Sequence, residues 1–201
     1  MWTRCLDKSW PRPIPDAMLT DFYWIDGPWP GRLAISARPR GGGWLENEIR
    51  AWRRAGIDAV VSLLTPDEAS ELGLEQEPNY CCANGISYYS LPIMDRSVPG
   101  SNRDVLRLIG KLGSELTGGK NVAIHCRQGI GRSSMIAAGL LLENGLSPAE
   151  AIQRVSSARR MLVPETPEQR EWIDSFGAAL ERNRSNPEGI SGKTASGRPR
   201  A

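Results

Sequence analysis

A cysteine, an arginine and two glycines lie close together in the segment VAIHCRQGIGRSSM, which begins at Val122. Four residues typical of a strand precede Cys126, and an apolar run typical of a helix follows Arg132. A tight turn from strand to helix directs backbone N–H groups into a concave site, and the helix N-terminus adds positive potential. Gly129 and Gly131 permit the backbone angles of such a turn. The sequence therefore predicts an anion-binding loop whose thiol is a nucleophile for transfer of an anionic group.

Strands alternate with helices in the part of the chain that must position this loop. Apolar segments of strand length cover residues 32–37, 59–64, 86–91 and 121–125, with helical apolar stripes between them. Three helix starts combine a hydroxyl, a proline and an acidic or amide side chain: Thr65-Pro-Asp-Glu68, Ser147-Pro-Ala-Glu150 and Thr166-Pro-Glu-Gln169. This order predicts an α/β fold, a single domain with a central, largely parallel sheet flanked by helices. Ligands bind beyond the carboxyl ends of such strands, where His125 and Cys126 lie.

The length of 201 residues suits one domain with its own core. We expect a loosely ordered segment at 1–20, the domain at 21–182 and a disordered tail at 183–201. The chain has 25 Lys and Arg against 23 Asp and Glu, a balance that does not indicate a nucleic-acid or membrane partner. We expect a cytoplasmic protein, because neither a secretory signal nor a membrane-spanning run is evident.

The four cysteines are Cys5, Cys81, Cys82 and Cys126. They match no metal-binding spacing, and the single histidine cannot complete a Cys/His zinc site. Free thiols in a reducing compartment are the simplest interpretation. We therefore expect no metal and no cofactor, with the charge of the bound anion met by N–H groups and Arg132.

The loop resembles the active-site pattern of the protein-tyrosine and dual-specificity phosphatase superfamily. The match covers every constrained position of Ile124-His125-Cys126-x-x-Gly129-x-x-x-Ser133-Ser134-x-Ile136. The resemblance implies a tyrosine-phosphatase-like fold in which Cys126 attacks phosphorus and forms a phosphocysteine. It implies that Ser133 hydrogen-bonds the thiolate and that His125 orients the loop through backbone contacts. The phosphoryl oxygens would be held by the loop residues Arg127, Gln128, Gly129, Ile130, Gly131 and Arg132.

Hydrolysis of a phosphate ester also needs a general acid for the leaving oxygen. The segment Leu91-Pro-Ile-Met-Asp95-Arg-Ser-Val-Pro99 is similar to the acid loop of compact dual-specificity phosphatases, notably the kinase-associated phosphatase. The resemblance implies that Asp95 is the acid and then the base, although a turn-forming aspartate is the alternative. Gln169 is similar to a water-positioning glutamine of classical tyrosine phosphatases, and a capping role also explains it.

Several functions remain open at this point. The expected substrate is a phosphorylated protein, with phosphotyrosine first and phosphoserine or phosphothreonine also open. A phosphoinositide phosphatase is an alternative that Arg127 favours, although such enzymes tend to carry lysines in this loop. A rhodanese-like sulfurtransferase usually has a shorter loop and needs no acid. A non-catalytic phosphate-binding module would lack the cysteine, the arginine or the acid, and none is missing.

Overall fold

The computed structural model describes residues 20–185. The expected N-terminal segment up to residue 19 and the expected tail from residue 186 onward lie outside the described residues. The last described helix continues to Ser185, past the expected domain end at 182.

Five strands form one mixed sheet in the order β1-β2-β5-β3-β4. Only β1 is antiparallel to its neighbour, so the predicted largely parallel sheet is confirmed. The edge strand β1 was not among the predicted strands. The bounds are β1 Phe22–Ile25, β2 Leu33–Ser36, β3 Ala59–Ser62, β4 Ser87–Ser90 and β5 Val122–His125.

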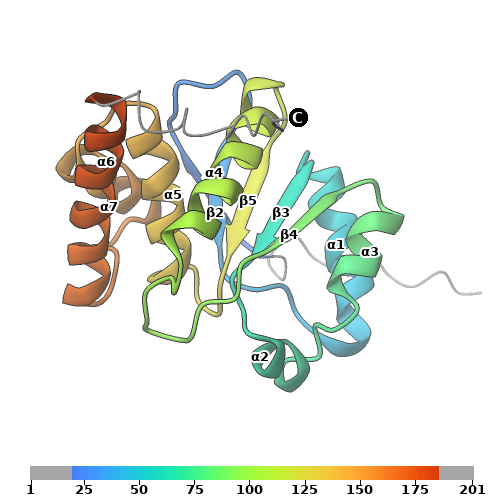
Figure 1. Cartoon of the computed structure of the whole chain (residues 1–201). Coiled ribbons are helices and arrows are strands. Elements are labelled where there is room, and N and C mark those ends of the chain that lie inside the picture. The colour runs from blue at the N-terminus through green and yellow to red at the C-terminus, as the bar shows by residue number, and fades with distance from the viewer. Residues whose placement is uncertain (1–19, 186–201) are drawn as a thin grey trace, which may run out of the picture.

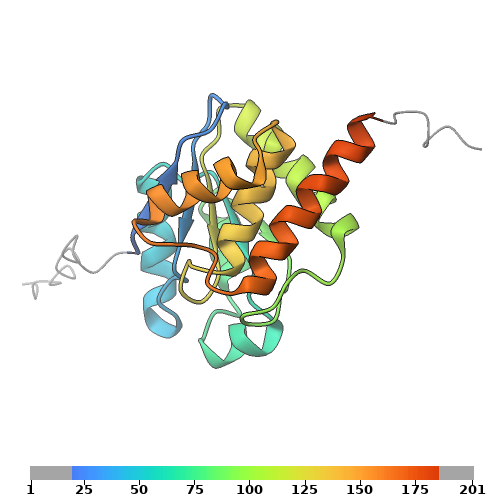
Figure 2. The same cartoon turned by 90° about the vertical axis from the view of Figure 1, so that its left-hand side faces the viewer.

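Helices cover both faces of the sheet, as Figure 1 shows. Helices α4 to α7 lie on one face, and α1 and α3 lie on the other. Figure 2 looks onto the layer that contains α5, α6 and α7. The bounds are α1 Leu45–Arg54, α2 Pro66–Glu71, α3 Glu77–Ala83, α4 Asn102–Thr117, α5 Arg132–Glu143, α6 Pro148–Arg159 and α7 Pro167–Ser185, with a 3-10 turn at Gly42–Trp44.

Alternation along β5 divides its side chains between two apolar cores. Ile124 belongs to the larger core, beneath α4 to α7, and Ala123 belongs to the smaller core, beneath α1 and α3. Because neighbouring strand residues face opposite sides of a sheet, the next two residues separate in the same way. Cys126 lies with the larger core, and the His125 ring lies against Trp52 of the smaller core. The imidazole and the thiol therefore occupy different sides of the sheet.

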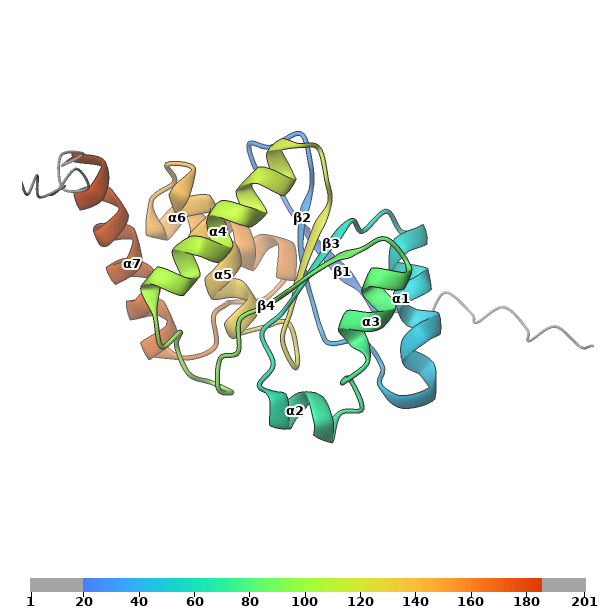
Figure 3. The same cartoon turned by 45° about the vertical axis from the view of Figure 1, so that its right-hand side comes forward.

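Three segments converge at the carboxyl ends of the parallel strands. Figure 3 shows α2 at the lower end of the sheet, beside the turn that follows β5 and the segment that follows β4. The predicted capping boxes at the starts of α2 and α6 are both complete. In the third predicted box, the Gln169 N–H donates to Thr166 Oγ1, but the Gln169 amide donates to the Ser97 carbonyl instead of closing the box. Long-range packing against the acid loop replaces the local contact there.

Candidate active site

The Cys126 thiol lies at the base of the loop between β5 and α5, and only 3% of the residue is exposed. The Gly129 N–H donates to Sγ at 3.3 Å, and Ser133 Oγ lies 3.6 Å from the same sulfur. The Gly129 N–H is thus directed at the sulfur, and the Ser133 hydroxyl lies within hydrogen-bonding distance of it. The predicted proximity of Ser133 to the thiol is therefore present in the structure.

Gly129 has a backbone φ of +67°, in the left-handed region that favours glycine. A Cβ atom at this position would lie 2.5 Å from the carbonyl oxygen of Ser36 at the end of β2. Both the angle and the close approach exclude a side chain. The turn can therefore bring its N–H to the sulfur only with glycine at this position.

Arg132 is the first residue of α5 and is 1% exposed. Its Nη1 donates to the Ile93 carbonyl at 2.8 Å, and its Nη2 donates to Asp95 Oδ1 at 2.7 Å. Burial lowers the pKa of Arg132. The hydrogen bond to Glu68 and the charge of Cys126 together raise that pKa by more, so it lies above its ordinary value. None of the hydrogen bonds between described residues uses its Nε, which leaves that donor for a phosphoryl oxygen.

Glu68 on α2 is a functional residue that sequence reasoning missed. Its two carboxylate oxygens accept from Arg132 Nη1 at 2.7 Å and Nη2 at 3.0 Å, a bidentate pair. Oε2 also accepts from the Thr65 N–H at 3.0 Å, within the capping box. The predicted cap therefore also fixes the carboxylate that holds Arg132.

The charge of Glu68 is maintained by these contacts. Burial raises its pKa, but hydrogen bonds from Arg132 and the Thr65 backbone, with the nearby positive charges, lower it more. Its pKa is therefore lowered below the ordinary value of 4.5, and the pair with Arg132 stays ionic at neutral pH.

Asp95 lies in the loop after β4, at the point where the sequence predicts the acid. Its side chain is 52% exposed on the solvent side of Arg132. The Ser97 N–H donates to the Met94 carbonyl at 3.1 Å, which closes a turn around Asp95. The buried Ile93 anchors this turn through its N–H, which donates to the Leu63 carbonyl at 3.1 Å. Asp95 is therefore accessible from solvent and in direct contact with Arg132.

His125 does not make the backbone contacts expected of its side chain. Its Nε2 lies 2.9 Å from Glu77 Oε1 on α3, and both side chains are 1% exposed. Neither imidazole nitrogen has a well-aligned hydrogen-bond partner among the described residues, so this contact is a close approach between two packed side chains. The Trp52 ring covers the imidazole with 6.1 Å between ring centroids. His125 thus joins the sheet to α1 and α3 from the side opposite the thiol.

Gln169, at the start of α7, is fully buried beside the loop between β5 and α5, which we call the phosphate loop after the anion-binding role predicted for it. Its Nε2 donates to the Ser97 carbonyl at 3.1 Å, and its Oε1 has no partner among the described residues. A Cβ atom on Gly131 would lie 2.7 Å from that Oε1. An acceptor without a partner therefore lies beside the loop, in the region where the sequence predicts a water-positioning glutamine.

Two other arginines fix the outside of the loop. Arg127 donates to Glu71 on α2 at 2.8 Å. Arg159, the last residue of α6, donates from Nε to the Gly129 carbonyl at 3.0 Å, and its guanidinium lies 4.0 Å from the centre of the Tyr23 ring. Its Nη2 also donates to the Gln128 carbonyl at 3.5 Å, on the side of that peptide opposite the Gly129 N–H that donates to the sulfur. Arg159 is a second contact that sequence reasoning missed.

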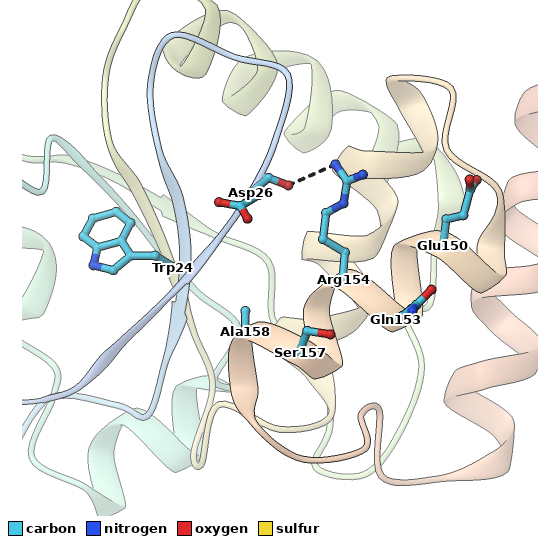
Figure 4. A pocket seen from close by; sticks show the side chains of 7 residues that line it. All are labelled: Trp24, Asp26, Glu150, Gln153, Arg154, Ser157 and Ala158. Carbon is cyan, nitrogen blue, oxygen red and sulfur yellow. Dashed lines mark hydrogen bonds between the residues drawn. The ribbon is translucent and has the colours of Figure 1, made fainter.

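A cavity of about 520 Å³ lies away from this site, between β1 and α6. Figure 4 shows Arg154 of α6 donating to the backbone carbonyl of Asp26, with Gln153 and Ser157 nearby. Cys126 and Asp95 do not line it.

Within residues 20–185, no group of three or more His, Cys, Asp or Glu could hold a metal ion. Among the described helices, none is both long and apolar enough to cross a bilayer.

Comparison with known proteins gives the family. The model of a family described as "Polymorphic toxin system, DSP-PTPase phosphatase" matches residues 36–146, more than half of the chain. This chain belongs to that family of dual-specificity phosphatases. The matched residues include the phosphate loop, Glu68 and Asp95.

A curated relative supports the assignment. A protein of Invertebrate iridescent virus 6 that is named as a tyrosine phosphatase is 30% identical over 138 residues. The match covers 67% of this chain and 50% of the viral protein, so the chain spans about half the length of that relative.

Solved structures share the fold. Kinase-associated phosphatase, in a variant whose catalytic-site cysteine is replaced by serine, matches with a TM-score of 0.74 at 21% identity, over 81% of this chain and 97% of that one. Tk-PTP, in its active form, matches with a TM-score of 0.66 at 30% identity, over 78% of this chain and 96% of that one. The predicted tyrosine-phosphatase-like α/β fold is confirmed.

Proposed function

We propose that this protein is a cysteine-dependent phosphatase that hydrolyses phosphate monoesters in proteins, phosphotyrosine above all. The proposal rests on one observation: three reactive side chains from the β5–α5 loop, the start of α5 and the loop after β4 lie at the same end of the sheet. The Cys126 thiol, the Arg132 guanidinium and the Asp95 carboxyl meet at one end of the sheet, with loop amides beside the sulfur. A nucleophile, an anion clamp and a proton donor are the three parts that two-step phosphoryl transfer requires.

In the first step, the Cys126 thiolate attacks phosphorus and forms a sulfur–phosphorus bond as the bond to the ester oxygen breaks. Asp95 in its protonated form gives its proton to the departing oxygen. The loop N–H groups and Arg132 hold the remaining phosphoryl oxygens, whose charge they stabilise in the transition state. The products of this step are the free alcohol and a phosphocysteine.

In the second step, water attacks the phosphocysteine and Asp95, now ionised, accepts a proton from that water. The sulfur–phosphorus bond breaks and inorganic phosphate is released. Ser133 stabilises the returning thiolate from its position 3.6 Å from the sulfur. In this proposal Gln169 orients the water, which is supported by its Oε1: that atom lies near Gly131 of the loop and has no partner among the described residues.

Asp95 and a phosphate group compete for one face of Arg132. Without substrate, Asp95 accepts from Nη2 at 2.7 Å and Glu68 accepts from both terminal nitrogens. A phosphate that binds Nη2 and Nε displaces Asp95 from the arginine but leaves Glu68 in place. The released carboxyl is then beside the ester oxygen, where it is needed as the acid.

A reducing compartment such as the cytoplasm fits this function. Cys81, Cys82 and Cys126 are free thiols among the described residues. The proposed nucleophile must be reduced to react, and oxidation would block it. We therefore place the enzyme in a compartment that keeps thiols reduced.

The proposal is tested with a small aryl phosphate in the presence of EDTA and reductant. Wild type is expected to turn over, Cys126→Ser to be inactive, and Asp95→Ala to lose activity by about 100- to 10,000-fold, the usual contribution of general acid–base catalysis. A wild-type protein that binds vanadate but hydrolyses no phosphate ester would instead indicate a phosphate-binding module.

A further inference from the structure

We infer that Met94, Met161 and Leu162 form an apolar rim that selects phosphoproteins in which an apolar residue flanks the phosphorylated one. The inference rests on the proposed function and names the substrate feature that the same site recognises. Its basis is the position of three of the five exposed large apolar side chains of the described residues, on loops that contact the phosphate loop or Arg132.

Large apolar side chains are exposed at few places among residues 20–185. Leu162 is 76% exposed, Met94 72% and Met161 42%. The other two are Trp44 and Leu106. Apolar side chains that gather at one place on a surface commonly mark a site of interaction with another molecule.

Met161 and Leu162 lie in a loop that is attached to the phosphate loop at both ends. Arg159 precedes them and donates to the Gly129 carbonyl at 3.0 Å. Glu165 follows them, and its Oε1 would lie 2.8 Å from a Cβ atom on Gly131. The two apolar side chains therefore belong to the immediate surroundings of the phosphate site.

The backbone of that loop is fixed despite the exposure of its side chains. The Val163 N–H donates to Ser156 Oγ at 3.2 Å, and that hydroxyl lies 3.2 Å from the Val163 carbonyl oxygen. The Met161 N–H donates to the Ser156 carbonyl at 3.2 Å. Val163 itself is fully buried. A surface that is already ordered costs less conformational entropy on binding, which favours recognition there.

Met94 lies between two residues that contact Arg132. The carbonyl of Ile93 and the carboxylate of Asp95 both accept from that guanidinium, at 2.8 Å and 2.7 Å. The acid loop is tied to the start of α7 by the bond from Gln169 to the Ser97 carbonyl, at 3.1 Å. The segment of Met94 and the loop of Leu162 are thus both joined by hydrogen bonds to the residues of the active site.

The occupant that fits this rim is a protein segment. A phosphate group fills the loop below, and the rim contacts whatever is attached beside it. Methionine side chains adapt to varied apolar partners, as a surface for different peptide side chains requires. Exposed carboxylates on Asp95 and Glu165 are balanced by exposed guanidinium groups on Arg96 and Arg160, so the rim lacks the excess of positive charge with which proteins bind anionic membranes. A phosphopeptide with an apolar neighbour is therefore favoured over a lipid headgroup.

The test compares two phosphotyrosine peptides that differ only at the flanking positions, with leucine in one and serine in the other. The quantity measured is the ratio of their kcat/KM values in wild type, Leu162→Ser and Met94→Ser. Leu106→Ser is the matched control, because Leu106 is 37% exposed on α4, outside the two rim loops. A small aryl phosphate and phosphoinositide vesicles are assayed in parallel.

Wild type is expected to prefer the leucine peptide about five- to tenfold, the effect of partly burying one aliphatic side chain. Leu162→Ser and Met94→Ser should reduce that ratio towards one, and Leu106→Ser should keep it. Equal rates on both peptides in wild type would overturn the inference while turnover of the small ester still supports a phosphatase. A loss on vesicles alone in Leu162→Ser would also overturn it, in favour of a membrane. No turnover of any ester would instead contradict the proposed function.

Discussion

Replacement of Glu68 by glutamine should impair catalysis although Glu68 touches no substrate in the proposed mechanism. Glu68 holds Arg132 through two charge-assisted hydrogen bonds, of 2.7 Å and 3.0 Å. Glutamine keeps one accepting oxygen and replaces the other by an NH2 group, which would face the arginine's own donors. The lost bond is of the charged kind, which contributes about 1.5–3 kcal/mol. If that energy fixes the guanidinium in the transition state, kcat/KM for a small aryl phosphate falls about 10- to 100-fold.

The control for this substitution lies one turn further along α2. Glu71 also accepts from an arginine of the phosphate loop, Arg127, at 2.8 Å, but its side chain is 62% exposed. Exposed pairs contribute only about 0–1 kcal/mol, so Glu71→Gln should change kcat/KM by about fivefold or less. Steady-state kinetics on the three proteins decide the matter. Wild-type kcat/KM in Glu68→Gln, or an equal loss in both variants, would refute the positioning role of Glu68.

The same pair makes a prediction about pH and stability. Because the folded pKa of Glu68 lies below its ordinary value of 4.5, the pair stabilises the fold above that value. Its contribution is lost as the pH falls through the folded pKa, where the carboxylate becomes protonated in both states. Urea titrations should therefore show Glu68→Gln less stable than wild type at pH 7 and the difference shrinking at acidic pH. A difference that stays constant at acidic pH would argue against an ionic origin.

Three further predictions concern other parts of the site. Gly129→Ala should reduce kcat/KM at least about tenfold, because its φ of +67° and the 2.5 Å approach to β2 impose strain of about 1–3 kcal/mol; wild-type kinetics would contradict this. Arg159→Met should lower kcat/KM several-fold by removing the 3.0 Å bond to the loop carbonyl, worth about 0.5–1.5 kcal/mol; a change in Tm alone would leave Arg159 a purely structural residue. In the native protein, iodoacetamide at pH 8 should label the exposed Cys82 and spare Cys81, whose pKa is raised by burial and by a nearby carboxylate; mass spectrometry of the peptides would reveal labelling of both.

The local features of this fold could be predicted because short-range physics determines them. The four predicted strands, two of the capping boxes and the strand-to-helix turn at Cys126 all depend on residues within a few positions of one another. The edge strand β1 was missed, since four residues after a proline-rich stretch give little periodic signal. It is defined by its pairing with β2, a contact that sequence patterns do not contain.

The partners missed by sequence reasoning all act at long range. Glu68 had a complete local explanation as a capping residue, and its contact with Arg132 joins positions 64 residues apart. Arg159 lies 30 residues from the loop carbonyl that it binds. Glu77 lies on α3, a helix that apolar periodicity did not predict. Each of these side chains reaches its partner only because the fold brings distant segments of the chain together.

The central claim is that Cys126 forms a covalent phosphoenzyme, and the most direct measurement is to trap it. Rapid mixing with an aryl phosphate, an acid quench within milliseconds and mass spectrometry of the digested protein would locate the phosphoryl group. The account predicts a burst of the alcohol product and a phosphoryl group on the peptide that contains Cys126, absent in Cys126→Ser. Turnover without any phosphoenzyme, or turnover that persists in Cys126→Ser, would contradict it.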